Sequence, residues 1–211
     1  MHTNGQAPED RRPASWLALG LSLFAVGVWL MPEVADVLQY DRAALAGGEL
    51  WRAVAGHWAH WSADHLVWDL AMFAVFGALL ERRSRARFVA VVVLSAVAIP
   101  AALWFAAPEF EYYRGLSGID SALFAAFFAQ LLADAWRSRS CLGGAVPVVA
   151  LLGFGGKSTF ELLTGSTVFV ADGVFTAVPL AHLVGAAVGV AAGVARCARV
   201  SVPTIECSLN C

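Results

Sequence analysis

Long apolar runs alternate with short polar segments along this chain. The first run, 14–31, carries no charge and is long enough to span a bilayer. No small-residue cleavage site follows it before Pro32, so we expect an uncleaved membrane helix. Further apolar runs cover 62–80, 88–107, 117–133, a less distinct stretch from Leu142, and 178–195. The pattern therefore predicts six transmembrane helices.

Two segments between these runs have a mixed character. Residues 32–61 combine polar and apolar positions without a clean period and include Trp51, Trp58 and Trp61, which predicts an interfacial loop with short helices. Three glycines and Lys157 blur the end of the fifth run. We therefore expect a loop over 157–176 that could act as a gate.

Composition is typical of an all-α membrane protein. The 211 residues are 59% hydrophobic and only 14% charged, a balance that a soluble domain of this size does not need. The net charge is −2 and the charges form short clusters, which argues against a nucleic-acid partner. Four cysteines, including Cys207 and Cys211, show no paired framework and are expected to be free thiols. We expect a disordered lead over 1–13, a membrane domain over 14–200 and a short cytoplasmic tail over 201–211.

The basic residues predict the orientation of the helices. With the N-terminus in the cytoplasm, the inside segments hold 10 of the 14 lysines and arginines. The outside loops hold only Arg42, Arg52, Arg114 and Lys157. The positive-inside rule therefore predicts that both termini are cytoplasmic.

Ser117 is a candidate nucleophile. Gly115 and Gly118 remove side chains on both sides of it, so a substrate carbonyl could approach the hydroxyl and the nearby backbone N–H groups. The first turn of a helix also leaves N–H groups unpaired, which suits an oxyanion. An ordinary loop-to-helix cap explains the same residues, so the interpretation depends on a base at the same depth.

Polar residues of three predicted helices fall at one depth. The second, fourth and sixth helices all run from outside to inside, and their ionisable or nucleophilic residues come early: His65, Asp69, Ser117, Asp120 and His182. Ionisable groups at this depth usually face the bundle interior or a water-filled cavity. A buried histidine bonded to a carbonyl remains the alternative for His182.

Small residues predict close packing of two helices. Gly185, Gly189 and Gly193 follow His182 at four-residue spacing, and Gly118, Ala122 and Ala126 form a matching stripe. Such stripes let helix backbones approach closely, so Ser117 and His182 could share a hydrogen bond.

A second cluster of polar residues lies around the start of the second helix. His65 and Asp69 are one turn apart and share a helix face, where they could polarise an oxyanion. With His57, His60 and Asp64 they could also form a metal cluster. Zinc sites usually have tighter ligand patterns, so we expect neither a metal nor another cofactor.

These motifs, in this order, resemble those of the rhomboid intramembrane serine proteases. The resemblance covers most of the chain and rests on Trp51-Arg52, on His60 with His65 and Asp69, on Gly115-Leu116-Ser117-Gly118, and on His182 with Gly185 and Gly189. It implies a six-helix rhomboid-like bundle in a bacterial inner membrane. It also implies that Ser117 is the nucleophile and His182 its base and acid, in a dyad without a third acid.

The resemblance assigns further residues to the site. The backbone N–H of Ser117 and the side chain of His65 would hold the oxyanion, with Asp69 at the neighbouring position. Supporting positions would be Gly115, Gly118, Asp120, His60, Gly185 and Gly189. Partners would be the lipid bilayer and a substrate with a transmembrane segment.

Within the family, the sequence is most similar to the rhombosortases. These short bacterial members are thought to process C-terminal sorting tails with Gly-Gly before a membrane helix. The similarity rests on the compact length, on Tyr40-Asp41-Arg42 leading to Gly48-Glu49-Leu50-Trp51-Arg52, on Gly56-His57, and on Tyr113-Arg114 before Gly115.

Two positions depart from the family pattern. The family usually has asparagine where this chain has Asp69, and an ionised carboxylate cannot donate to an oxyanion. Either Asp69 stays protonated and donates, or it turns away and His65 acts alone. Ser121 stands where a tyrosine or histidine often packs on the catalytic histidine, so Asp120 either orients His182 or only serves the first helical turn.

The sequence thus predicts an intramembrane serine endopeptidase that cuts near the outer face. Water must reach Ser117 from the periplasmic side, and substrates need small, helix-destabilising residues near the cut. One alternative is an inactive relative that binds membrane helices, made credible by Asp69. The other is a small transporter or channel that uses the histidines and aspartates.

Overall fold

The computed structural model describes residues 15–166, 168 and 178–195, and within these ranges the chain is mostly helical. Four of the helices described are long and apolar enough to cross a membrane. They are α5 (Ala63–Arg83), α6 (Arg85–Ala106), α7 (Ser117–Arg137) and α8 (Cys141–Thr164). Each corresponds to one of the apolar runs, so the chain is a multi-pass membrane protein.

The first and last predicted spans are shorter than the apolar runs suggested. The first is α1 (Trp16–Trp29), which is bent by 110° against α2 (Pro32–Leu38) and counts as a fifth candidate span only if the pair is taken together. Pro32 stands at the first helical position of α2, where a proline favours a new helix start. The last is α9 (Pro179–Val194), an apolar helix of 16 residues. Four or five candidate spans are therefore supported where the sequence predicted six.

The fifth predicted helix was ended too early. α8 continues through the glycines at 153–156 and through Lys157 to Thr164, where Gly165 closes it with a left-handed φ of 68°. The expected loop over 157–176 is thus helical in its first part, and 169–177 lies outside the described residues. Hydrogen bonding explains the continuation, because a backbone at membrane depth must satisfy its own polar groups.

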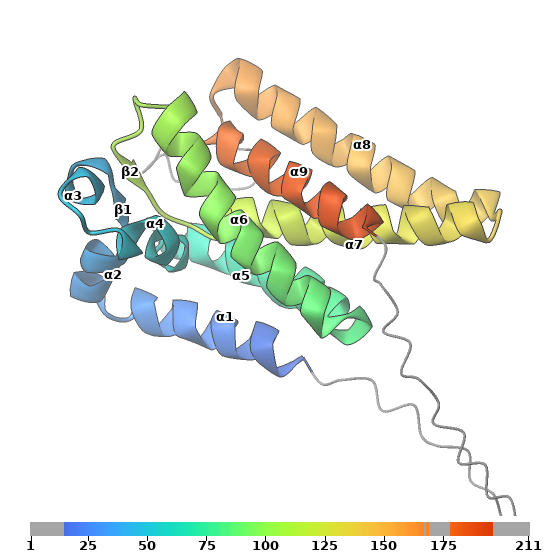
Figure 1. Cartoon of the computed structure of the whole chain (residues 1–211), viewed down its shortest axis with the longest axis horizontal. Coiled ribbons are helices and arrows are strands. Elements are labelled where there is room, and N and C mark those ends of the chain that lie inside the picture. Colours follow the sequence, from blue (N-terminus) through green and yellow to red (C-terminus); the bar gives the residue numbers. More distant parts are fainter. Residues whose placement is uncertain (1–14, 167, 169–177, 196–211) are drawn as a thin grey trace, which may run out of the picture.

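Short elements gather at one end of the bundle (Figure 1). Residues 32–61 form short helices as predicted, but they also contain a two-residue strand that the sequence did not indicate. Besides α2, this segment forms β1 (Tyr40–Asp41), α3 (Arg42–Ala46), α4 (Trp51–Ala55) and the 3₁₀ turn η1 (Gly56–Trp58). The remaining short element, β2 (Tyr112–Tyr113), comes later in the chain. β1 pairs antiparallel with β2, which ties this loop to the segment just before Ser117.

α7 is the central helix of the bundle. It packs against α5, α6, α8 and α9, and 56% of its most apolar 18-residue stretch is buried. In Figure 1, α1 lies on one side of the bundle and α8 and α9 on the other. Because α7 is central, residues at its N-terminal end can be reached by side chains from several neighbouring helices.

The predicted stripe of small residues is confirmed. A Cβ added at Gly185 or Gly189 would overlap the carbonyl oxygen of Gly118 or Ala122, respectively, and a Cβ at Gly193 would lie 2.6 Å from the carbonyl oxygen of Ala126. Glycine is required on α9 because the backbones of α7 and α9 touch here. This contact sets the distance between the N-terminal ends of the two helices.

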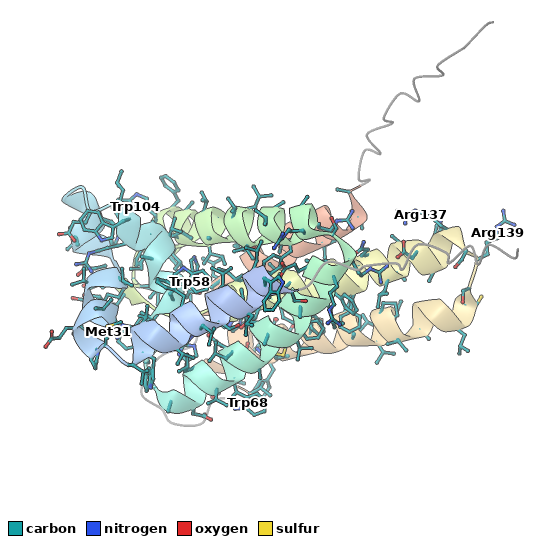
Figure 2. The ribbon with its side chains drawn as sticks, turned by 90° about the horizontal axis from the view of Figure 1, so that it is seen from below. Met31, Trp58, Trp68, Trp104, Arg137 and Arg139 are labelled. Atoms are coloured by element: carbon teal, nitrogen blue, oxygen red, sulfur yellow. The ribbon has the colours of Figure 1, made fainter. Side chains whose placement is uncertain are left out.

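The two ends of the bundle differ in their side chains. Figure 2 places Met31 and Trp104 at one end and Arg137 and Arg139 at the other. The first end also carries the short helices and strands, while the second carries the turn between α7 and α8. The expected lead over 1–13 and the tail over 201–211 lie outside the described residues.

Candidate active site

A cavity of about 1070 Å³ opens among α5, α7, α8, α9 and the segment before α7. Its lining brings together His65, Asp69, Ser117, Asp120 and His182, which the sequence placed at one depth. Aromatic side chains from α5, α7 and α8 form much of the remaining wall, among them Trp68, Phe76, Phe124 and Phe154. The residues that the sequence placed in one layer therefore line a single cavity.

Ser117 begins α7 directly after a tight turn. Gly115 has a φ of 122°, which L side chains rarely adopt, and a Cβ there would come within 2.7 Å of the His65 ring. The Gly115 N–H donates to the carbonyl of Gly56 at 3.3 Å, which joins the turn to η1. Glycine at 115 thus allows the chain to pass close to His65 and to deliver Ser117 to the cavity.

Ser117 and His182 meet across the α7–α9 contact. The Ser117 Oγ lies 3.0 Å from Nε2 of His182, a hydrogen-bonding distance. His182 is buried in the first turns of α9, four residues after Val178 at its N-cap. A buried histidine at this distance can accept the hydroxyl proton, which is the requirement for an activated serine.

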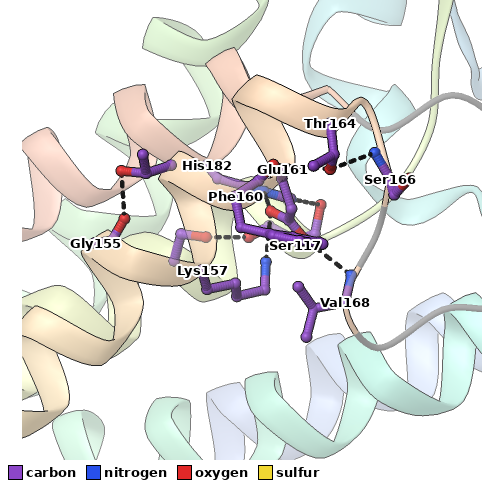
Figure 3. A network of polar contacts seen from close by, with 11 residues as sticks. Ser117, Gly155, Lys157, Phe160, Glu161, Thr164, Ser166, Val168 and His182 are labelled. Carbon is purple, nitrogen blue, oxygen red and sulfur yellow. Dashed lines mark hydrogen bonds and ion pairs between the residues drawn. The ribbon is translucent and has the colours of Figure 1, made fainter.

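A third side chain, which the sequence analysis did not select, contacts His182 from α8. Oε2 of Glu161 lies 3.0 Å from Nδ1 of His182, on the opposite side of the ring from Ser117 (Figure 3). The expectation of a histidine without an acid partner was therefore wrong. Glu161 is the only acidic residue between Cys141 and Val168, and an ionisable residue within an apolar run is a signal that could have identified it.

Two donors hold the Glu161 carboxylate in place. Lys157, one turn earlier on α8, has its Nζ 2.8 Å from Oε2, and the backbone N–H of Val168 lies 3.3 Å from Oε1. Figure 3 draws these contacts together with Ser117 and His182 as one continuous network. The charge of Glu161 is therefore compensated within the site.

His60, His65 and Asp69 form a second group at the cavity. Oδ2 of Asp69 lies 3.2 Å from Nε2 of His60 and 3.3 Å from Nε2 of His65. The same oxygen accepts the backbone N–H of Leu116 at 2.7 Å. Asp69 thus acts as an acceptor that ties α5 to the residue before Ser117, a role that neither sequence hypothesis for Asp69 anticipated.

Two further side chains support the turn before α7. Tyr113 donates its hydroxyl to the carbonyl of Gly115 at 3.1 Å, and burial raises the pKa of Tyr113, so this donor stays protonated. Burial lowers the pKa of His57 to about 4, and its neutral ring packs edge-on against Tyr113 with ring centroids 5.5 Å apart. Both residues hold the turn with neutral groups.

Asp120 does not orient His182. Glu161 occupies the Nδ1 side of the ring, and within the described residues neither carboxyl oxygen of Asp120 has a hydrogen-bond partner. In the same part of the chain, no group of three or more histidine, cysteine, aspartate or glutamate side chains could hold a metal ion.

We expect Asp69→Ala to lower the free energy of unfolding by about 1–3 kcal/mol, because the buried Leu116 N–H would lose its acceptor. Asp69→Asn keeps a carbonyl acceptor and should cost less. Thermal unfolding of both variants in detergent measures the difference. An alanine variant as stable as the wild type would contradict the supporting role of Asp69.

The asparagine variant also tests the protonated-donor hypothesis from the sequence. If Asp69 must be protonated to donate, Asp69→Asn should react faster than the wild type with a serine-directed probe at high pH. Equal labelling at every pH would exclude that hypothesis and leave the acceptor role.

The fold and the cavity define a class: a multi-pass helical membrane protein with a serine and a histidine hydrogen-bonded inside the bundle. Comparison with family models refines it. Residues 47–199 match the Rhomboid domain, and the chain belongs to the rhomboid family. Rhomboid proteins are generally serine intramembrane proteases that act on transmembrane substrates in the bilayer. No curated protein matches the chain.

Proposed function

We propose that this protein is an active intramembrane serine endopeptidase. The observation that carries the proposal is the 3.0 Å contact between Ser117 Oγ and His182 Nε2 within the cavity. A serine and a histidine meeting from two different helices give a nucleophile its base, which plain helix packing does not require.

The reaction follows from this geometry. Ser117 Oγ attacks the scissile carbonyl carbon while its proton passes to Nε2 of His182. The backbone N–H of Ser117 and the His65 side chain stabilise the negative oxygen of the tetrahedral intermediate. His182 then protonates the departing amine as the C–N bond breaks, and water hydrolyses the acyl-enzyme by the reverse proton transfers.

The cavity suggests how a substrate binds. Phe76 of α5 and Phe154 of α8 both pack against Phe124 of α7, with ring centroids 5.0 and 5.6 Å apart, and all three line the cavity with Ser117. An unwound stretch of a transmembrane segment could lie between these helices. A helix hides its carbonyls in hydrogen bonds, so the cut site needs residues with low helix propensity.

We propose that the reaction takes place near the periplasmic face of a bacterial inner membrane. Support comes from the arginines at the α7–α8 end of the bundle, away from the short helices that close the Ser117 end (Figure 2). The positive-inside rule puts that basic end and both termini in the cytoplasm. Water would then reach Ser117 from the periplasm.

The finer proposal is a rhombosortase-like protease that removes C-terminal sorting tails with Gly-Gly before a membrane helix. It rests on the sequence motifs around Arg52 and Ser117, whose residues support one another in space. Arg52 bonds the carbonyls of Asp36 and Gln39 at 2.9 and 3.3 Å. Arg114 bonds the side chain of the same Gln39 at 2.8 Å, which holds the segment before Ser117.

A catalytically inactive, helix-binding relative is the second candidate. The observation in its favour is the carboxylate of Asp69. Its Oδ2 lies 3.2 Å from the position that a Cβ on Gly115 would take, and therefore beside the turn that precedes Ser117. A negative charge there would oppose an oxyanion.

Cleavage of single-span reporters tests the proposed function. One reporter carries Gly-Gly at the periplasmic end of its membrane helix, and the matched control carries Leu-Leu. Because each glycine costs about 1 kcal/mol of helix stability, the Gly-Gly reporter should be cut up to about 30-fold faster. Mass spectrometry of the products locates the cut.

Either of two results would contradict the proposal. Equal cleavage of both reporters would exclude recognition of an unwound segment. Binding of the Gly-Gly reporter without products at any pH would identify the inactive relative.

A further inference from the structure

Glu161 is a buried carboxylate in direct contact with the histidine of the candidate site. It is 1% exposed, and its Oε2 lies 3.0 Å from Nδ1 of His182 (Figure 3). A carboxylate only accepts hydrogen bonds, so Nδ1 must carry the proton. That tautomer leaves Nε2 with its lone pair directed at the Ser117 hydroxyl, 3.0 Å away.

We propose that Glu161 is a positioning residue for His182, so that the site works as a serine–histidine–glutamate set whose third member comes from α8. The inference rests on the proposed protease function. Glu161 selects the tautomer that can accept the Ser117 proton, and its negative charge stabilises the imidazolium that forms when the proton is transferred.

Neither aspartate of the predicted layer competes for this role. Within the described residues, the carboxyl oxygens of Asp120 have no hydrogen-bond partner, and the carboxylate of Asp69 faces His60, His65 and the Leu116 N–H. Lys157 binds the same oxygen of Glu161 at 2.8 Å. A cation at that distance compensates the buried carboxylate and keeps it ionised and directed at the ring.

Because Glu161 lies on α8, its contact with His182 also links the orientation of the His182 ring to the position of α8. Most of α8 faces outward from the bundle, since only 11% of its most apolar 18-residue stretch is buried. Its buried residues are Pro147, Ser158 and Glu161. Because α8 also lines the cavity, any outward movement of its end that widens the cavity removes Glu161 from His182. His182 is therefore fully oriented by Glu161 only while α8 keeps the position described here.

Inactivation kinetics with a fluorophosphonate probe test the role of Glu161. Glu161→Gln keeps the size of the side chain but loses its charge and allows the wrong tautomer. We expect the maximal inactivation rate to fall about 10²- to 10⁴-fold while the probe concentration at half-maximal rate stays within about twofold. Glu161→Asp keeps the charge on a shorter stem and should fall between Gln and the wild type.

Ser158→Ala is the matched control. Ser158 is buried on the same helix, and its hydroxyl has no hydrogen-bond partner among the described residues. The probe should inactivate the Ser158→Ala variant at the wild-type rate. A Glu161→Gln variant that matches Ser158→Ala in inactivation rate would overturn the proposal. Equal losses of inactivation rate in Glu161→Gln and Glu161→Asp would overturn it as well.

A second measurement applies to the folded wild type and does not depend on any variant of Glu161. ¹⁵N NMR of the His182 ring, assigned with His182→Ala, should find the proton on Nδ1. A proton on Nε2 alone would overturn the positioning role. A wild type that is folded but never labelled would count against the protease function, while the ring tautomer would still decide the role of Glu161.

Discussion

Replacing Ser117 with alanine is expected to abolish covalent labelling by a fluorophosphonate probe and to reduce reporter cleavage at least about 10³-fold. The probe reacts only with an activated serine, and the Ser117 hydroxyl lies 3.0 Å from a base, Nε2 of His182. His182→Ala should have a similar effect, since Ser117 would keep its proton. Labelling and cleavage are measured on the detergent-solubilised proteins.

Ser121→Ala is the control for this experiment. Ser121 lies one turn after Ser117 on α7, and its hydroxyl bonds the Ser117 carbonyl at 2.7 Å within the helix. It should be labelled like the wild type. If Ser117→Ala is still labelled, or if Ser121→Ala alone loses the label, Ser117 is not the nucleophile.

The second large effect is expected at the contact between α7 and α9. Gly185→Ala would drive a methyl group into the carbonyl oxygen of Gly118, which is backbone and cannot rotate away. Overpacking of this kind costs about 1–3 kcal/mol or more. Displacement of α9 would also carry His182 away from Ser117, and a shift of about 1 Å can cost about 10²-fold in rate. Thermal unfolding and probe labelling measure the two consequences.

Gly155→Ala on α8 separates this effect from a general response to the loss of a glycine. A Cβ at Gly155 would meet nothing within 4 Å. Because alanine favours a helix over glycine by about 1 kcal/mol, this variant should be as stable as the wild type or more so. If both variants unfold at the same temperature as the wild type, the close α7–α9 contact is not a determinant of stability.

Depth and helix packing could be predicted from the sequence because both follow from local patterns. Each helix rises 1.5 Å per residue, so His65, Ser117 and His182 were placed in one layer from their positions in their apolar runs. The four-residue spacing of Gly185 and Gly189 predicted a flat helix face in the same way. In the structure the three polar residues line one cavity, and the backbones of α7 and α9 touch at the two glycines.

The end of α8 could not be predicted from residue preferences alone. Glycines at 153–156 and Lys157 usually favour a helix end, yet the helix continues to Thr164. In an apolar environment a broken helix leaves unpaired backbone groups, which outweighs the low propensity of glycine. With the helix ended early, Glu161 fell into a presumed loop and its approach to His182 was missed.

The sequence by itself determined the membrane class, four of the helices, the motif order and the small-residue stripes, because apolar length and periodicity act within one element. Only the tertiary structure decided which side chains meet from different elements. Glu161 reaches His182 across 21 residues of chain, and Asp69 reaches the Leu116 N–H across 47. Such contacts depend on how helices pack in three dimensions, and no local pattern encodes them.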